Sequence, residues 1–167
     1  MEKNGKVQSF SFDWERLVQT NTQYYLKIFR DYEDNGTKEP WNWAAAIFGV
    51  YWFAYRKMFR RARIFFALYV VITALQIVII ANSMFFPISV VFELGMFLYF
   101  GYTGNHSYYL YVNRTIKNIA TWEEQSNYMI DWYVKAGGTS ILSAIGFCLA
   151  MAASEVIIIL VVFAILF

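Results

Sequence analysis

Charged side chains are scarce in this sequence of 167 residues, because Asp, Glu, Lys and Arg together make up 16% of it. A soluble domain carries roughly 25% charged residues, so there is too little charge here to cover a water-facing surface. Hydrophobic residues reach 59% and aromatic residues 21%. This balance predicts that lipid is the solvent for part of the chain. The net charge of +2 gives no reason to expect a nucleic-acid partner.

Cysteine and histidine are almost missing, with one residue of each, Cys148 and His106. A lone cysteine inside an apolar run excludes disulfide frameworks and thiolate metal clusters. His106 has no second ligand nearby, so we expect it to form hydrogen bonds at the membrane edge. Phosphate-binding glycine loops, nucleophile elbows and His-Glu-x-x-His motifs are also absent from the sequence. We therefore expect a protein that is not an enzyme and holds no metal or cofactor.

Long apolar runs supply three candidate membrane spans. The first extends from Ile64 to about Asn82, and the second from about Ile88 to Tyr102. The last, Thr139 to Phe167, is apolar except for Glu155 and a few hydroxyl groups. Its roughly 28 residues would measure about 42 Å as a helix, against a hydrocarbon core of about 30 Å. One tilted helix therefore explains this run more simply than two short ones.

Residues 41–55 form a shorter apolar run that is rich in Trp and Tyr. A span needs about 20 residues, and these aromatic residues are typical of the headgroup level. We predict an interfacial or re-entrant segment here, with an additional crossing as the alternative. If this segment does not cross, every Lys and Arg lies on one side of the membrane. By the positive-inside rule, we then expect a cytoplasmic N-terminus and an outer C-terminus.

The expected fold is all-α: a polytopic membrane protein with about three transmembrane helices and short amphipathic cytoplasmic helices. Residues 22–34 should form a surface helix with one aromatic face, capped by Thr20-Asn21-Thr22 and ended by Asn35-Gly36. A capping box, Thr121 to Glu124, should start a later helix that Gly137-Gly138 ends. The polar start of the chain predicts no signal peptide. The segments are 1–40 (cytoplasmic N-terminal amphipathic helices), 41–59 (interfacial or re-entrant segment), 60–119 (transmembrane hairpin that turns at Asn82-Ser83 and Pro87 and continues as a cytoplasmic helical extension), 120–137 (cytoplasmic amphipathic helix) and 138–167 (C-terminal transmembrane helix).

Two motifs carry a resemblance to a known family. The first is Trp41-Asn42-Trp43-Ala44-Ala45 followed by Tyr55-Arg56-Lys57-Met58-Phe59, and the second is Gly104-Asn105-His106-Ser107-Tyr108. Together they resemble the signature of the DUF2628 family of small bacterial membrane proteins over about residues 22–118. The resemblance implies a location in the bacterial inner membrane and implies no reaction, because the family is functionally uncharacterised. The chain adds a helix and a third span to the usual pattern.

A basic cluster follows the interfacial segment. It could bind anionic lipid headgroups or the acidic surface of a partner, at about 1 kcal/mol per charge. The simpler interpretation, which we favour, is an ordinary signal that stops and orients the first span. The cluster comprises Arg56, Lys57, Arg60, Arg61 and Arg63.

Glu93 and Glu155 lie inside predicted spans. A carboxylate in lipid costs several kcal/mol unless it is protonated or partnered, which makes such a residue a functional candidate. The two carboxylates could face each other or line a cation or proton path in an oligomer. Alternatively, each is protonated and bonded to Ser143, Ser154, Thr73 or Gln76 of a neighbouring helix.

Small residues recur every four positions in the last span, at Gly146, Ala150 and Ser154. This pattern allows close helix packing, either within the chain or in a homo-oligomer. We first expect a scaffold or accessory subunit that binds a cytoplasmic partner or anionic lipid. An oligomeric pore, or a toxin- or defence-type effector using Glu155 and Glu93, is the alternative. A lipid-modifying enzyme is least favoured, because no nucleophile–base pair is visible.

Overall fold

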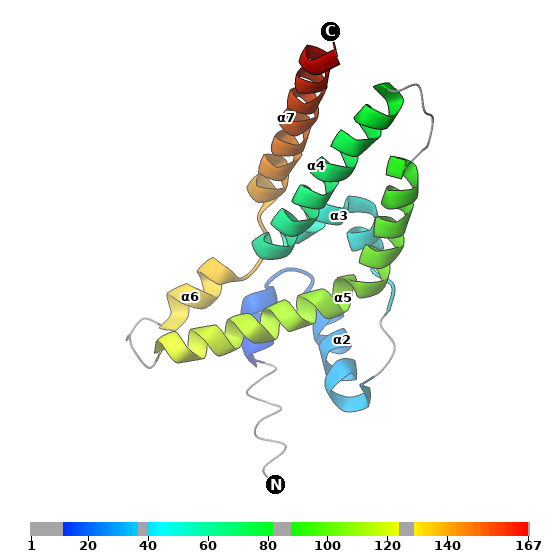
Figure 1. The fold of residues 1–167 in the computed structure, drawn as a ribbon. Coiled ribbons are helices and arrows are strands. Elements are labelled where there is room, and N and C mark those ends of the chain that lie inside the picture. The colour runs from blue at the N-terminus through cyan, green and yellow to red at the C-terminus, as the bar shows by residue number, and fades with distance from the viewer. Residues whose placement is uncertain (1–11, 37–39, 82–87, 124–128, 167) are drawn as a thin grey trace. The chain divides into compact units, whose positions relative to one another are not determined.

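The computed structural model describes residues 12–36, 40–81, 88–123 and 129–166, and within these ranges the regular structure is all helical. The prediction of an all-α fold is thereby confirmed. A short helix over residues 12–18 precedes the labelled ones (Figure 1). The labelled helices are α2 (Thr22–Asn35), α3 (Trp43–Tyr55), α4 (Phe59–Ala81), α5 (Ile88–Glu123), α6 (Met129–Ala136) and α7 (Ile141–Leu166).

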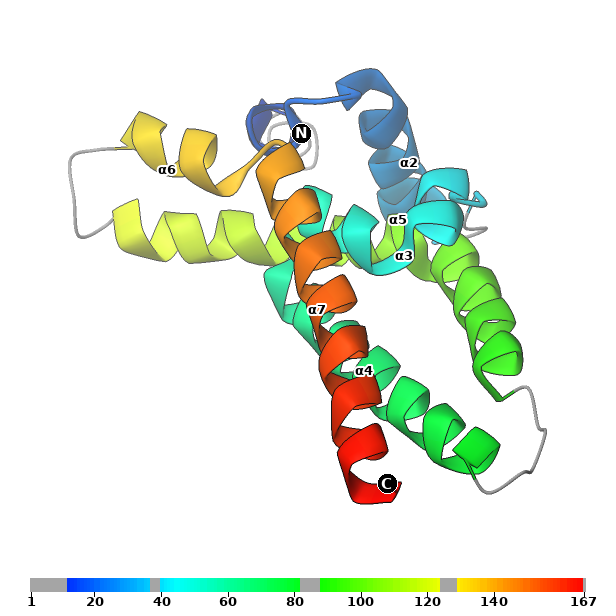
Figure 2. The same ribbon diagram turned by 90° about the horizontal axis from the view of Figure 1, so that it is seen from above.

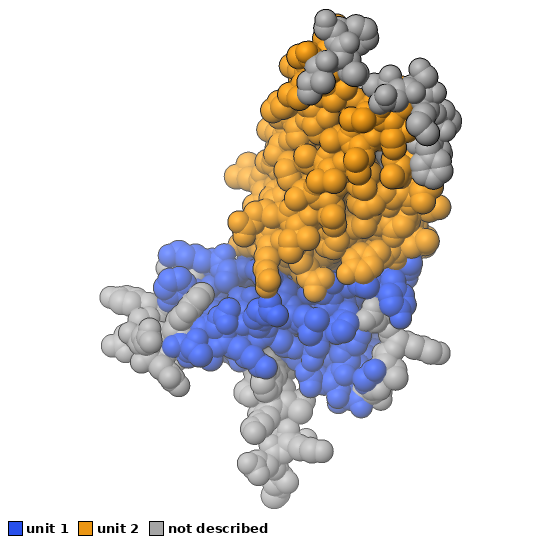
Figure 3. Space-filling view, in the orientation of Figure 1, with its two compact units in different colours: residues 1–42, 102–139 blue, residues 43–101, 140–167 orange. Residues whose placement is uncertain are grey.

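The chain divides into two compact units, which Figure 3 shows in different colours. Unit 1 comprises Met1–Asn42 and Tyr102–Thr139, and unit 2 comprises Trp43–Gly101 and Ser140–Phe167. Each unit therefore gathers stretches that are far apart in the sequence. Helix α5 contributes its first part to unit 2 and its second part to unit 1.

Unit 1 has an aromatic core. The face of α2 that the spacing predicted is present, but it points inward, because Tyr25 and Phe29 are buried. The ring of Tyr25 lies 4.9 Å from that of Tyr108 on α5, and the ring of Phe29 lies 5.4 Å from that of Tyr109. The indole Nε1 of Trp14 donates a hydrogen bond to Asn113 Oδ1 at 2.7 Å. Edge-to-face ring pairs add to the stabilisation that burial alone provides.

The start of α2 differs from the prediction, whereas its end agrees. Asn21 occupies the N-cap position with φ of 60°, and its side chain makes no capping hydrogen bond. An Asn cap normally has extended backbone angles, so the left-handed conformation removes the side chain from the capping geometry. Gly36 follows the helix with φ of 59°, a conformation that glycine adopts without strain.

Helix α5 continues through the predicted capping box. Thr121 lies inside this helix of 36 residues, and its hydroxyl donates to the carbonyl of Asn118 at 2.7 Å. The prediction that Thr121 starts a new helix is therefore wrong, because its side chain bonds back within its own helix, as hydroxyl residues do inside helices. The last residue of the predicted box, Glu124, lies outside the described residues.

Gly137 and Gly138 end α6 as predicted. The amide of Gly138, at φ of 71°, donates to the carbonyl of Leu17 at 2.8 Å. A Cβ atom on Gly137 would clash with the same Leu17 carbonyl oxygen. Glycine is therefore required here by the close approach of two backbone segments.

Unit 2 is built on α3, α4, α7 and the first part of α5. Helices α4 and α7 contact each other and lie side by side in both views, starting from the same end (Figures 1 and 2). Phe53 of α3 and Phe100 of α5 are buried, with ring centres 5.1 Å apart. Phe65 of α4 completes this cluster at 4.7 Å from Phe100. Buried aromatic residues thus join three of the helices.

Most of α7 and much of α4 remain uncovered in the isolated chain. No described residue of α7 is buried. Among the described residues, two stretches are long and apolar enough to cross a membrane, Phe59–Ile80 and Trp132–Ala164. The shorter apolar helix α3 is broken in its middle, as described below. The predicted turn at Asn82-Ser83 and Pro87 lies outside the described residues.

Candidate functional site

A cavity of about 390 Å³ lies in unit 2 and is lined in part by polar side chains. All four helical parts of the unit contribute to its lining. The polar side chains are those of Tyr51, Tyr69, Thr73, Glu93 and Glu155. The structure therefore places the two predicted intramembrane carboxylates, 62 positions apart in the sequence, on one cavity. The sequence alone does not determine whether these two carboxylates face a common space.

A break in α3 shapes one wall of this cavity. Gly49 has φ of 48° and ψ of −121° within the helix, a combination that residues with a Cβ atom rarely adopt. A Cβ atom at this position would also lie 3.3 Å from the ring of Phe100. The residues around the break, from Ala46 to Tyr51, line the cavity. Interruption of the helix frees backbone groups from their usual partners beside the carboxylates.

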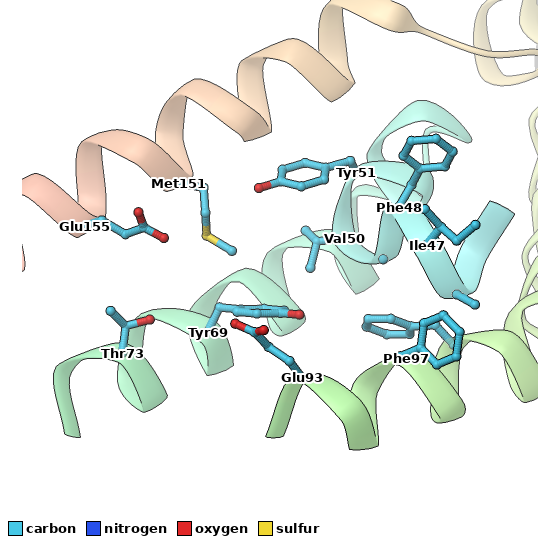
Figure 4. A pocket seen from close by; sticks show the side chains of 13 residues that line it. Ile47, Phe48, Val50, Tyr51, Tyr69, Thr73, Glu93, Phe97, Met151 and Glu155 are labelled. Atoms are coloured by element: carbon cyan, nitrogen blue, oxygen red, sulfur yellow. The ribbon is translucent and has the colours of Figure 1, made fainter. Parts of the chain in front are cut away.

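Each carboxylate lies near a tyrosine (Figure 4). Glu93 interacts electrostatically with Tyr69 of α4, and its side chain lies beside that ring in Figure 4. Glu155 of α7 interacts with Tyr51 of α3, and both side chains point into the cavity. Phenol groups donate and accept hydrogen bonds. The cavity therefore offers oxygen atoms of two kinds, carboxylate and hydroxyl, and among the described residues no side chain with a nitrogen atom lines it.

The sequence suggested four hydrogen-bonding partners for the carboxylates, and the structure places only one of them at the cavity. Thr73 lines the cavity. Ser154 instead donates to the carbonyl of Met151 at 2.7 Å, and Ser143 donates to Ser140 Oγ at 2.8 Å. The protons of those two hydroxyl groups are therefore used within α7 and its first turn. Gln76 does not line the cavity.

The two sequence motifs meet in unit 1 through a buried pair of asparagines. Asn42 Nδ2 donates to Asn105 Oδ1 at 2.8 Å. Asn105 Nδ2 donates to the carbonyl of Pro40 at 2.8 Å and lies 3.2 Å from the hydroxyl of Tyr24. Tyr108, the last residue of the second motif, is also buried. These residues join the segment before α3 to α5, so their role is structural.

The residues Tyr55 to Met58 form the turn between α3 and α4. The amide of Met58 donates to the carbonyl of Phe53 at 2.8 Å, and that of Lys57 donates to Ala54 at 3.0 Å. Lys57 has φ of 58°. These two bonds and the left-handed residue define a Schellman motif, in which glycine is more usual. The carbonyl of Tyr55 also accepts from the Ser140 amide at 2.8 Å, which fixes the start of α7.

Burial divides the basic cluster. Arg56 is 4% exposed, and its guanidinium lies 5.8 Å from the centre of the Tyr55 ring. Arg60 and Arg63 are exposed on the first turns of α4, whereas Lys57 and Arg61 are partly buried. The exposed members therefore remain candidates for binding an anionic group, whereas Arg56 is buried.

A family model described as a protein of unknown function, DUF2628, matches residues 17–114, more than half of the chain. The chain belongs to the DUF2628 family. Comparison with curated proteins and with solved structures found no match. Both motifs lie within the matched residues, so the buried asparagine pair and the Schellman turn belong to the part of the fold that the DUF2628 family defines.

The DUF2628 match ends before α6 and α7. Glu93 lies inside the matched range, but Glu155 lies beyond it. The cavity therefore combines one carboxylate from the family segment with one from the additional helix. The small-residue positions Gly146, Ala150 and Ser154 belong to that same helix.

His106 sits among aromatic rings. Its ring centre lies 5.5 Å from that of Tyr32 and 6.3 Å from that of Tyr109. No group of three metal-ligating side chains occurs in the part of the chain that the structure describes. Tyr51 and Tyr69 are not predictable from the sequence as cavity residues, because nothing in their spacing links them to Glu93 or Glu155. Only the packing of α3 and α4 brings them to the cavity.

Proposed function

We propose that this protein is an integral membrane protein of three spans that binds a small cation or a proton in the cavity of Glu93 and Glu155. The spans are α4, the first part of α5 and α7. Large apolar side chains project from all three in the isolated chain, among them Leu68, Leu98 and Leu149. Contiguous exposed apolar surface of this kind indicates a contact with lipid or protein.

Charge supports the orientation in which unit 1 faces the cytoplasm. All fourteen Lys and Arg residues precede Ile64 or lie between Thr103 and Gly138. With α3 as an interfacial or re-entrant segment, these stretches share one side of the membrane. The positive-inside rule then places the N-terminus in the cytoplasm and the C-terminus outside, and family membership favours a bacterial inner membrane.

The carboxylate cavity carries the functional proposal. An ionised carboxylate at membrane depth costs several kcal/mol unless it has a partner. A bound proton or a bound cation lowers this cost for the two carboxylates that line the cavity. Oxygen atoms are the ligands that hard cations prefer. The broken helix α3 adds backbone groups at the same place, as in transporter sites built on interrupted helices.

Infrared spectroscopy of the full chain in lipid vesicles tests this proposal. The carbonyl band of a protonated carboxyl should weaken as pH rises or as NaCl, KCl or MgCl₂ is added. Glu155→Gln and Glu93→Gln should each remove that response. Glu15→Gln changes an exposed carboxylate of unit 1 and should leave it intact. A wild-type spectrum that responds to neither pH nor cations contradicts the proposal.

Flux measurements separate binding from conduction. In vesicles loaded with a pH-sensitive dye, a pore would dissipate an imposed proton gradient, whereas a binding site without a path would preserve it. A leak that Glu155→Gln abolishes would favour the oligomeric pore.

A scaffold role is the second candidate. Its support is apolar surface on unit 1, where Phe12 is 60% exposed and Val134 of α6 is 59% exposed. Such surface on the cytoplasmic side fits a protein partner. Crosslinking from positions 12 and 134 in cells tests it, with Glu15 as a control position. The scaffold role is contradicted if positions 12 and 134 capture no more protein than position 15.

A further inference from the structure

A second cavity, of about 420 Å³, lies in unit 2 between α4 and α7. None of the described residues lines both this cavity and the carboxylate cavity. Its walls are apolar except for Ser143 and one charged side chain, that of Arg63. The remaining lining residues are Phe59, Phe66, Gly146, Phe147 and Ala150.

This second cavity is a groove between α4 and α7, and its apolar walls suit a lipid acyl chain. Phe66 and Phe147 meet edge to face, with ring centres 6.2 Å apart and planes at 88°. A Cβ atom on Gly146 would meet nothing within 4 Å, so the small residue leaves open space. The seven helical steps from Phe59 to Phe66 correspond to about 10 Å along α4. This length accommodates several methylene groups of one lipid tail.

The positive charge of Arg63 indicates which kind of ligand the groove binds. Arg63 is exposed near the start of α4, where its Nε donates to the carbonyl of Phe59 at 3.4 Å. No carboxylate pairs with Arg63 among the described residues, so its terminal amino groups can take a further acceptor. A guanidinium binds phosphate oxygens in a bidentate manner. In the proposed orientation, the first turns of α4 lie at the cytoplasmic headgroup level.

We propose that this groove binds one anionic phospholipid, with an acyl chain between α4 and α7 and the lipid phosphate on Arg63. The site extends the membrane placement proposed above and does not depend on the carboxylate cavity. The competing occupant is a second copy of the chain, since small residues at Gly146 and Ala150 also suit helix association. A lipid fits better, because its phosphate supplies an acceptor for Arg63, whereas the carboxylates of the proposed spans, Glu93 and Glu155, line the other cavity.

Native mass spectrometry of the full chain, released from nanodiscs of equal phosphatidylglycerol and phosphatidylcholine, tests the site. The wild type should retain phosphatidylglycerol preferentially. Arg63→Gln should lower that preference about fivefold, the effect expected for one cation at an anionic headgroup. Gly146→Leu and Ala150→Leu each fill the groove and should abolish retention of either lipid. Soluble glycerol phosphate should not displace the lipid.

Two control variants are matched to these changes. Arg60→Gln removes a neighbouring exposed arginine that does not line the groove, and Gly95→Leu adds the same side chain at another helical glycine with open space around it. Gly95→Leu should retain the lipid as the wild type does, and Arg60→Gln should lower the preference for phosphatidylglycerol clearly less than Arg63→Gln does. An equal loss with Arg60→Gln, unchanged retention in both leucine variants, or a wild type that retains neither lipid overturns the proposal. A dimer that Gly146→Leu dissociates while lipid retention persists assigns the groove to a second copy and also overturns it.

Wild-type insertion into vesicles distinguishes the two proposals. Failure of the chain to insert would remove both. A chain that inserts and shows no cation response would leave the lipid site standing.

Discussion

Asn42 and Asn105 share a buried hydrogen bond of 2.8 Å across 63 positions of sequence. Both side chains are almost completely buried, at 3% and 0% exposed. Buried amides are stable only when their hydrogen-bonding groups are satisfied, and Asn105 uses both of its amide hydrogens on Pro40 and Tyr24. The two DUF2628 motifs are therefore connected through this hydrogen-bonded pair, which fixes the segment before α3 against α5.

Asn105→Asp should destabilise unit 1 by about 3 kcal/mol, because it replaces a buried donor by an acceptor and adds a buried charge. The Pro40 carbonyl would then face a carboxylate oxygen. The loss should diminish as pH falls, since protonation of the introduced carboxylate restores a donor. Thermal unfolding in detergent, followed by circular dichroism at two pH values, measures both effects. Asn118→Asp, at an exposed position of the same helix, should change stability little. Equal effects of the two variants would contradict the structural role of the pair.

The break at Gly49 gives a second prediction. Gly49→Ala should destabilise unit 2 by about 1–3 kcal/mol, because its backbone angles are unfavourable for any residue with a Cβ atom. Gly95→Ala on α5 is the matched change in a regular helix with open space, and it should stabilise by about 0.5–1 kcal/mol. Denaturant titration in detergent compares the two. If both variants were stabilised, α3 would be a continuous helix.

The periodicity and length of apolar runs predicted the all-α fold, the extended helix α5 and the single helix α7. Gly36 and the Gly137-Gly138 pair were predicted correctly as helix ends, because glycine reports backbone conformation locally. The predictions of helix caps at Asn21 and Thr121 were wrong, because a hydroxyl or amide side chain can form hydrogen bonds with several different backbone groups. Only the surrounding fold decides between them.

Individual residues of the candidate site could be predicted from the sequence, but their arrangement around one cavity could not. Glu93 and Glu155 could be identified from the sequence, because an ionised carboxylate within an apolar run has a high free-energy cost in lipid. That they line one cavity depends on the packing of α7 beside α3 and α4, which no local pattern encodes. The positions of Tyr51 and Tyr69 at the cavity could not be predicted for the same reason. The burial of Arg56 likewise follows from tertiary packing, whereas the sequence shows only five basic residues close together.

Lys57 provides a third prediction, at the turn between α3 and α4. Its φ of 58° places a side chain where glycine is favoured, so Lys57→Gly should stabilise the protein by about 0.5–1 kcal/mol. Lys57→Val should destabilise it by at least as much, since a β-branched residue resists this conformation. Arg60→Gly, inside α4, should instead cost about 1 kcal/mol. Thermal unfolding of the three variants gives their order, and a loss of stability in Lys57→Gly would show that the lysine side chain itself matters at this turn.

Tyr109 gives the fourth prediction, which concerns alkaline pH. Burial, together with a hydrogen bond to the Glu33 carboxylate, raises the pKa of Tyr109 from 10.0 to about 12. Because the folded state holds this proton more tightly than the unfolded chain does, its stabilising contribution is complete below pH 10. It is then lost as pH rises through about 12. Tyr109→Phe should lower stability by less than about 1 kcal/mol at neutral pH, since solvent screens this pair. That deficit should shrink as pH rises from 10 to about 12.

Glu33→Gln separates the two causes of the shift in Tyr109. Burial raises the pKa most, and the carboxylate adds to it. The variant keeps the burial and removes the charge, so the tyrosine pKa should fall while remaining above its ordinary value. Ultraviolet absorbance of tyrosinate, recorded as the difference between each protein and its Tyr109→Phe counterpart, isolates this one residue. An alkaline titration of Tyr109 that Glu33→Gln leaves unchanged would show that α2 and α5 are not coupled through this bond.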